Sequence, residues 1–183
     1  LSNFVLNVGT LVMSFFSGIV DASDRVLPGG FPAPFRRLLG LKVEEMEALE
    51  PQVVRHIRSA EGGARCGQWI DLIQLEGAEA IASFTEDFYA NRPAVTRNAH
   101  GRGLAYYVGT QVELDYLRRL FVSLCQETGI RPPLKVPAGV EAVTRVNENG
   151  RFLFLLNHTA HPQFIELAAL EGRDLLTDQS VSG

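Results

Sequence analysis

The 183-residue sequence predicts an α/β domain followed by a small all-β domain. Three observations support this prediction. A continuous apolar run at residues 11–16 is typical of a central strand that is covered on both faces of a parallel sheet. Residues 110–128 carry the pattern of an amphipathic helix. After a proline-containing stretch, the pattern changes to short strands around an Asn-Gly pair, which favours a hairpin.

Local signals place the elements of the first domain. Residues 1–7 have the pattern of a helix end, with Gly9 in its C-terminal turn, and the strand at 11–16 follows directly. A long loop rich in glycine and proline follows at 17–34, and Gly40 ends a short helix at 35–39. Further strands are expected at residues 52–58, 69–75, 93–98 and 103–109, with one more directly after Glu76-Gly77. Residues 69–75 alternate between polar and apolar side chains, which indicates a half-exposed antiparallel strand.

The clearest helix signal covers residues 110–128. Thr110 and Glu113 have the spacing of a capping box, and Gly129 stands where such a helix would end. Asp115 is spaced to pair with Arg119 one turn later. One face carries an apolar stripe made of Leu114, Leu117, Leu120, Phe121 and Leu124.

A stretch with several prolines separates the two domains. We expect the first domain at residues 1–131, a linker at 132–137 and a small β domain at 138–183. Asn149-Gly150 favours the tight turn of a β-hairpin, and further strands are expected at 163–169 and 172–177. A hairpin is only marginally stable alone, so this one needs something to pack against.

Composition argues against several classes of protein. The net charge of −4 does not suit a general nucleic-acid binder, because binding phosphates requires a basic surface. No apolar run approaches the roughly 20 residues that span a bilayer, and the start of the chain lacks the basic region and cleavage site of a signal peptide. Two cysteines are too few for a disulfide framework or a zinc site. We therefore expect a cytoplasmic protein without a membrane, nucleic acid or metal partner.

The stretch SGIVDASDR at residues 17–25 is the strongest candidate site. Asp21, Asp24 and Arg25 follow the strand at 11–16, and ligands of open α/β sheets bind at the carboxyl ends of strands. A pair of carboxylates could serve glycoside hydrolysis. The interpretation that we favour is an ordered surface loop, in which Ser17 and Asp21 bind backbone amides while Asp24 and Arg25 form local or intersubunit ion pairs.

Other motifs give weaker signals. The Gly-x-Gly at residues 101–103 precedes a strand rather than a helix, which argues against a dinucleotide fingerprint. Cys66 leads into a strand and Cys125 lies inside a helix, so neither has the strand-to-helix setting of a catalytic nucleophile. The four histidines lack a metal-binding spacing. We therefore assign no catalytic, cofactor-binding or metal-binding residue and expect no cofactor.

Several long motifs, in order along nearly the whole chain, resemble the family-42 glycoside hydrolases, the bacterial β-galactosidases. The resemblance to the middle domain of that family lies in FFSGIVDASDRVLPGGFPAPFRRLLGLKVEE and WIDLIQLEGAEAIASFTEDFYANRPAVTRNAHGRGLAYYVGT. The resemblance to the start of the small C-terminal domain lies in GVEAVTR and GRFLFLLNHT. The chain also starts within a helical pattern and stops shortly after a strand signal, so we expect a fragment of a longer protein.

The resemblance implies a parent protein with a catalytic (β/α)₈ barrel, an α/β trimerisation domain and a small β domain. It implies that the trimerisation domain is flavodoxin-like and related to class I glutamine amidotransferases. The family's two catalytic glutamates lie on the barrel, and no residue of this chain matches either. The parent is expected to be a homotrimer that hydrolyses terminal β-D-galactosides with retention and binds the galactoside mainly through its barrel. This chain is then expected to serve assembly.

The expected interface residues come from the long loop: Asp21, Asp24, Arg25 and Phe31. Two alternatives remain. A stand-alone amidotransferase-like enzyme would require a reactive nucleophile such as Cys66. A sugar-binding module would stack its ligand on Trp69, Tyr106 and Tyr107, although the two tyrosines are adjacent on a strand and face opposite sides.

Overall fold

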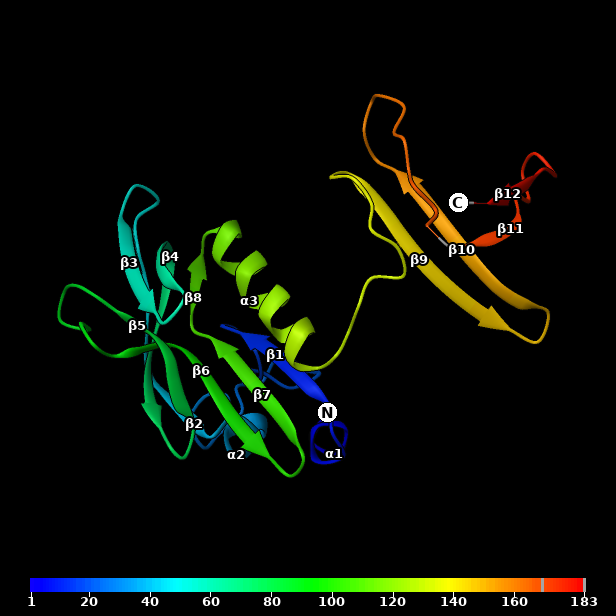
Figure 1. Ribbon diagram of the computed structural model, residues 1–183. Helices are drawn as coiled ribbons and strands as arrows, with labels where there is room; N and C mark the ends of the chain where they lie inside the picture. Colours follow the sequence, from blue (N-terminus) through cyan, green and yellow to red (C-terminus); the bar gives the residue numbers. More distant parts are fainter. Residues whose placement is uncertain (169, 183) are drawn as a thin grey trace. The chain divides into compact units, whose positions relative to one another are not determined.

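A computed structural model describes residues 1–168 and 170–182 of the chain (Figure 1). The contacts divide the chain into two units, Leu1–Leu124 and Cys125–Gly183, and each unit is described by itself. The first unit is mostly a mixed sheet with few helices, and the second contains small antiparallel sheets. No helix among the described residues is both long and apolar enough to cross a membrane.

The first unit contains one eight-stranded sheet. Its strands are β1 (Thr10–Ser14), β2 (Leu41–Ala48), β3 (Val54–Ser59), β4 (Gly62–Leu75), β5 (Glu79–Phe84), β6 (Pro93–His100), β7 (Gly103–Val108) and β8 (Thr110–Val112). Their order is β1-β7-β6-β5-β3-β4-β2, and β8 pairs with β4. The β1/β7 pair is parallel, whereas the other pairs of this sheet are antiparallel.

The prediction that residues 11–16 form a central strand of a parallel sheet is wrong, because β1 lies at the edge of the sheet. Its apolar run has another cause. Val12 packs against one buried cluster, while Leu11 and Met13 pack against a second cluster. Successive side chains of a strand point to opposite faces, so an edge strand that is covered on both faces also needs a continuous apolar run.

Four short or medium helices flank the sheet. They are α1 (Ser2–Leu6), the 3₁₀ helix η1 (Ala33–Phe35), α2 (Arg36–Leu39) and α3 (Leu114–Glu127). The N–H of Gly9 donates to the carbonyl of Phe4 at 2.9 Å, as expected for the turn after α1. Gly40 ends α2 in the left-handed conformation, at φ +63°, which confirms its predicted role.

The predicted helix start at Thr110 is wrong. Residues 110–112 form β8 instead, because β4 offers them a hydrogen-bonding edge. The helix therefore begins four residues later, and the carbonyl of Glu113 accepts bonds from the N–H groups of Tyr116 and Leu117. Asp115 pairs with Arg118 at 2.9 Å rather than with Arg119.

Buried residues form two clusters on the two faces of the sheet. The helix α3 lies over one face (Figure 1) and buries Tyr116, Leu120 and Leu124 there. The opposite cluster joins α1 and α2 to the sheet and contains Val5, Leu38, Leu39, Leu41, Val43, Ile73, Ala105 and Tyr107. The predicted stripe on α3 is thus narrower than expected, since Leu114 and Phe121 are 60% and 48% exposed.

The second unit contains the predicted hairpin. It consists of β9 (Val140–Asn147) and β10 (Gly150–Asn157), and β11 (Glu171–Arg173) pairs with β12 (Ser180–Ser182). Asn147 pairs with Gly150, so the turn lies at residues 148–149, one position before the expected place. The strand predicted at 163–169 is not formed over 163–168, and its last residue lies outside the described residues. The strand predicted at 172–177 is reduced to its first residues, because a turn follows.

Candidate functional site

The long loop after β1 is ordered by Asp21. One carboxylate oxygen, Oδ1, accepts hydrogen bonds from the backbone N–H groups of Ser23 at 2.8 Å and Arg25 at 3.1 Å. The other oxygen, Oδ2, binds the guanidinium of Arg25 at 2.9 Å. The bonds from the Ser23 and Arg25 amides, helped by the guanidinium, lower the pKa of the Asp21 carboxyl. These bonds agree with the interpretation of an ordered loop, because both oxygens of the Asp21 carboxylate bind groups of the loop itself.

The other expected interface residues differ in exposure. Asp24 is exposed and has a left-handed backbone at φ +58°, and the side chain of Arg25 is 80% exposed. Phe31 is half-buried and packs against the cluster that contains Leu38. Its carbonyl accepts a bond of 2.7 Å from the N–H of Val43 in β2. An interface role for these residues, and for Asp21, stays a prediction.

An aromatic cluster lies directly before this loop, and sequence reasoning missed it. Phe15 and Phe16 follow the end of β1, and both rings contact the indole of Trp69 in β4, with centroid distances of 6.3 and 4.2 Å. Phe16 is 58% exposed, whereas Phe15 and Trp69 are half-buried. The three residues form one aromatic surface at the carboxyl end of the parallel β1 strand.

A buried carboxylate, that of Asp71, binds the indole of this cluster. Asp71 is 1% exposed, and its two oxygens accept hydrogen bonds from Trp69 Nε1 at 2.8 Å and from the Tyr107 hydroxyl at 2.6 Å. Burial raises the pKa of the Asp71 carboxyl, and burial beside this carboxylate also raises the pKa of the Tyr107 hydroxyl. The signal in the sequence is a lone aspartate inside an apolar strand, which indicates a satisfied buried group.

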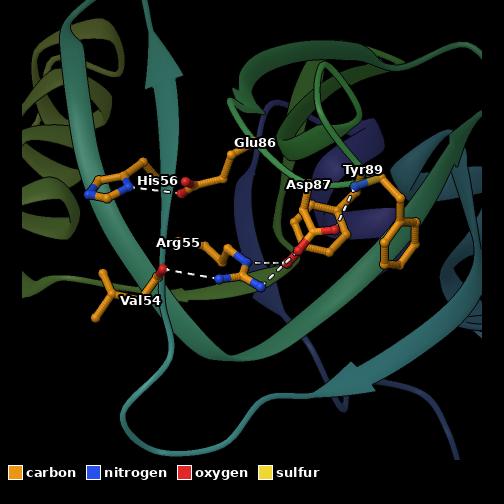
Figure 2. A network of polar contacts seen from close by, with 7 residues as sticks. Val54, Arg55, His56, Glu86, Asp87 and Tyr89 are labelled. Carbon is orange, nitrogen blue, oxygen red and sulfur yellow. Dashed lines mark hydrogen bonds and ion pairs between the residues drawn. The ribbon is translucent and has the colours of Figure 1, made fainter.

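A second polar network joins β3 to the loop between β5 and β6 (Figure 2). Arg55 donates through Nε to the hydroxyl of Tyr89 at 2.6 Å and through Nη2 to the carboxylate of Asp87 at 2.8 Å. The neighbouring His56 contacts Glu86 at 2.8 Å. Two consecutive residues of β3 therefore hold two consecutive acidic residues of the loop (Figure 2).

The residue at the centre of this network is Tyr89. It is 0% exposed, and its ring lies 5.1 Å from that of Phe84 and 4.7 Å from that of Phe88. Burial raises the pKa of the Tyr89 hydroxyl. The hydrogen bond from Arg55 to Tyr89 raises the pKa of the Arg55 guanidinium. Phe88 itself is 68% exposed, so the network fixes a loop that carries one exposed ring.

Three of the four residues that the two alternatives require are buried, and the fourth, Trp69, is half-buried. Cys66 is 5% exposed, and burial raises the pKa of its thiol to about 11, which is the opposite of an activated nucleophile. Tyr106 and Tyr107 are 3% and 2% exposed, so the idea that they offer a sugar-stacking surface is wrong. Within the described residues, no group of three or more His, Cys, Asp or Glu side chains is arranged to hold a metal ion.

Several surface carboxylates are engaged by arginines. These pairs are Asp21–Arg25, Glu76–Arg36, Asp87–Arg55 and Glu113–Arg65. A retaining glycosidase needs two carboxyl groups about 5 Å apart that face its substrate. Carboxylates held in ion pairs and a buried Asp71 suit structural roles instead.

Comparison with known families places the chain among the trimerisation and C-terminal domains of β-galactosidases. Residues 1–131 match the family described as the β-galactosidase trimerisation domain, and residues 139–183 match the β-galactosidase C-terminal domain. The chain belongs to the β-galactosidase trimerisation-domain family and continues into the C-terminal domain family.

Individual relatives agree with this placement. The chain is 42% identical to β-galactosidase BgaA of Planococcus sp. (strain 'SOS Orange') over 98% of its length, and it spans 28% of that protein. It is 44% identical to β-galactosidase BgaB of Geobacillus kaustophilus over 91% of its length, and it spans 25% of that protein. Among solved structures, it superposes on the β-galactosidase from Bacillus circulans sp. alkalophilus with a TM-score of 0.91 and 38% identity, covering 100% of this chain and 28% of that one. For Gan42B, a β-galactosidase from G. stearothermophilus, the catalytic mutant E323A gives a TM-score of 0.87 at 31% identity, covering 100% of this chain and 27% of that one.

Proposed function

We propose that this chain is the assembly and C-terminal portion of a β-galactosidase, a longer protein that hydrolyses terminal β-D-galactosides with retention. The observation that carries the proposal is the match of residues 1–131 and 139–183, in that order, to the two domain families named for β-galactosidases. The chain spans about 28% of its relatives, so catalysis is assigned to the remaining part, where the resemblance places the barrel and its two glutamates.

The proposed contribution of this chain is to hold three copies of the parent together. Three identical head-to-tail contacts close into a ring, which is the simplest symmetry for a trimer. The loop residues Asp21, Asp24, Arg25 and Phe31 are proposed interface groups, and what supports them is their position in one ordered loop. We also propose the division into 1–131, 132–137 and 138–183, and a cytoplasmic location, which suits two cysteines that are both free.

The flavodoxin-like and amidotransferase-like assignment of the first unit also stays a proposal. What supports it is the start of the unit, where α1 leads into β1 and β1 pairs in parallel with β7. Under this assignment, the antiparallel pairs formed by β2 to β6 are additions to a parallel sheet.

Two activity measurements test the proposed function. The isolated 183-residue chain should not hydrolyse p-nitrophenyl β-D-galactoside. A chimera, in which this chain replaces the matching segment of Planococcus BgaA, should hydrolyse that substrate and assemble. Turnover by the isolated chain would contradict the assignment of catalysis to the absent part. A folded chimera that stays monomeric would contradict the assembly role.

A further inference from the structure

The aromatic cluster of Phe15, Phe16 and Trp69 combines exposure with rigidity. Phe16 is 58% exposed and has a backbone φ of +65°, a conformation that L residues other than glycine rarely adopt. The N–H of Phe15 donates to the carbonyl of Val108 at 3.1 Å, which extends the β1/β7 pairing up to the turn. Unfavourable backbone conformations persist where the surroundings fix them, and they gather at binding surfaces.

The indole beneath Phe16 is held from the protein interior. Asp71 binds Trp69 through one oxygen and Tyr107 through the other, and its own N–H donates to the carbonyl of Gly109 at 2.7 Å. Since Asp71 and Tyr107 are 1% and 2% exposed, this support is built into the core. The orientation of the Trp69 ring is therefore set before any partner arrives, which reduces the entropy lost on binding.

The loop that follows Phe16 adds apolar surface. Val20 and Val26 form a bridge between the two arms of this loop, and they are 43% and 64% exposed. The loop is closed on itself by the bonds of Asp21 described above. An ordered loop with exposed aliphatic side chains thus continues directly from the exposed ring of Phe16.

The chemistry of this surface favours a protein partner over a sugar. A sugar site needs polar groups that are free to bind hydroxyls beside the stacking ring. Here the two oxygens of Asp71 bind Trp69 and Tyr107, and the carboxylate of Asp21 binds its own loop. A rigid aromatic centre is instead typical of the energetically dominant part of a protein interface.

We propose that Phe16 and Trp69, supported by Asp71, are the centre of a contact with a second copy of this chain. This proposal rests on the proposed function, since residues 1–131 match a family described as a trimerisation domain. It assigns the contact to the carboxyl end of β1 and identifies Phe16 as its exposed anchor and Asp71 as a positioning residue.

The test uses the 183-residue chain and its single tryptophan. We expect the molar mass from light scattering to exceed 20.1 kDa and to rise with concentration. The emission maximum of Trp69 should move to shorter wavelength in parallel, because the contact removes water from the indole.

The variant Phe16→Gly removes the ring and suits the left-handed backbone, so it should keep the circular dichroism spectrum while association shifts to at least tenfold higher concentration. Phe88→Ala removes a ring that is more exposed, at 68% against 58% for Phe16, and should associate like the wild type.

Each contrary result has a distinct meaning. A folded Phe16→Gly chain that associates like the wild type overturns the proposed contact and leaves the assembly role intact. A wild-type chain that stays at 20.1 kDa at all concentrations overturns both. Quenching of Trp69 by galactose at constant mass identifies a sugar site and overturns the protein contact.

Discussion

Arg55 donates a hydrogen bond of 2.6 Å to the hydroxyl of Tyr89, a side chain with 0% exposure that lies 34 positions further along the chain. Because the same guanidinium also binds Asp87, Arg55 fixes two residues of the β5–β6 loop (Figure 2). The bond satisfies the one polar atom of a buried ring, which an apolar core cannot leave unpaired.

Removing this hydroxyl should reduce stability modestly. Tyr89→Phe keeps the ring contacts with Phe84 and should lower the free energy of unfolding in urea by about 1 kcal/mol. In a double-mutant cycle with Arg55→Met, the combined change should be smaller than the sum of the single changes, since both remove one interaction. Strict additivity would show that the two residues are not coupled. Arg118→Met, which breaks the exposed pair with Asp115, is the control, with an expected change below about 0.5 kcal/mol.

Asp71 should give stability an unusual dependence on pH. Burial raises the pKa of its carboxyl above the ordinary value of 3.8, so the folded chain binds this proton more tightly than the unfolded chain. The stabilising contribution is complete at low pH and is lost as pH rises through the raised pKa. Relative to Asp71→Asn, the wild type should therefore gain stability as pH falls from neutral toward about 4.

Asp21 provides a control of opposite sign. Its pKa is lowered by the backbone bonds from Ser23 and Arg25, so its contribution is lost as pH falls through that lowered value. Thermal unfolding at several pH values compares Asp71→Asn and Asp21→Asn with the wild type. Parallel profiles for wild type and Asp71→Asn would contradict the role of burial at Asp71.

Cys66 should be unreactive in the folded chain. Burial raises the pKa of its thiol to about 11, so almost no thiolate is present near neutral pH. In the variant Cys125→Ser, which leaves Cys66 alone, labelling with dithiobis(nitrobenzoic acid) should be at least about tenfold slower in buffer than in urea. Rapid labelling of the folded chain would revive the amidotransferase-like alternative.

Gly40 should resist substitution by alanine. Its φ is +63°, and an added Cβ would lie 2.6 Å from the side-chain oxygen of Asn98 and 2.9 Å from the backbone nitrogen of Ala78. Gly40→Ala should cost about 1–3 kcal/mol in the free energy of unfolding, because backbone strain and a close contact add together. Gly63→Ala is the matched control, since its nearest contact would be 3.6 Å from the carbonyl of Ile57 and its expected change is within about 0.5 kcal/mol. Equal costs for both variants would contradict this explanation.

Local signals predicted local structure well. The Asn-Gly pair led to the β9/β10 hairpin, and Gly40 ended α2 where expected. The predicted start of α3 was wrong because the capping pattern depends only on residues 110–113. Residues 110–112 form β8 instead, through pairing with β4, which is distant in the sequence. The apolar run at residues 11–16 fitted a central parallel strand as well as a double-covered edge strand, and only the neighbouring strands decide between them.

The candidate sites show the same difference between local contacts, which the sequence predicts, and contacts between distant residues, which it does not. The ordering of the loop by Asp21 was foreseen, because the residues involved lie within four positions of one another. The cluster around Trp69 was not foreseen, since Phe16 and Tyr107, which contact Trp69 and Asp71, lie far from them in the sequence. Its remaining sequence signal was Asp71, one acidic residue among apolar neighbours.

The most direct test of the central claim is the mass of the intact assembly by native mass spectrometry. If the 183-residue chain is an assembly portion, its spectrum should be dominated by a species of three times 20.1 kDa. The same preparation should lack galactosidase activity. A spectrum with monomer alone, recorded for folded chain at the highest usable concentration, would contradict the claim that this chain assembles its parent protein.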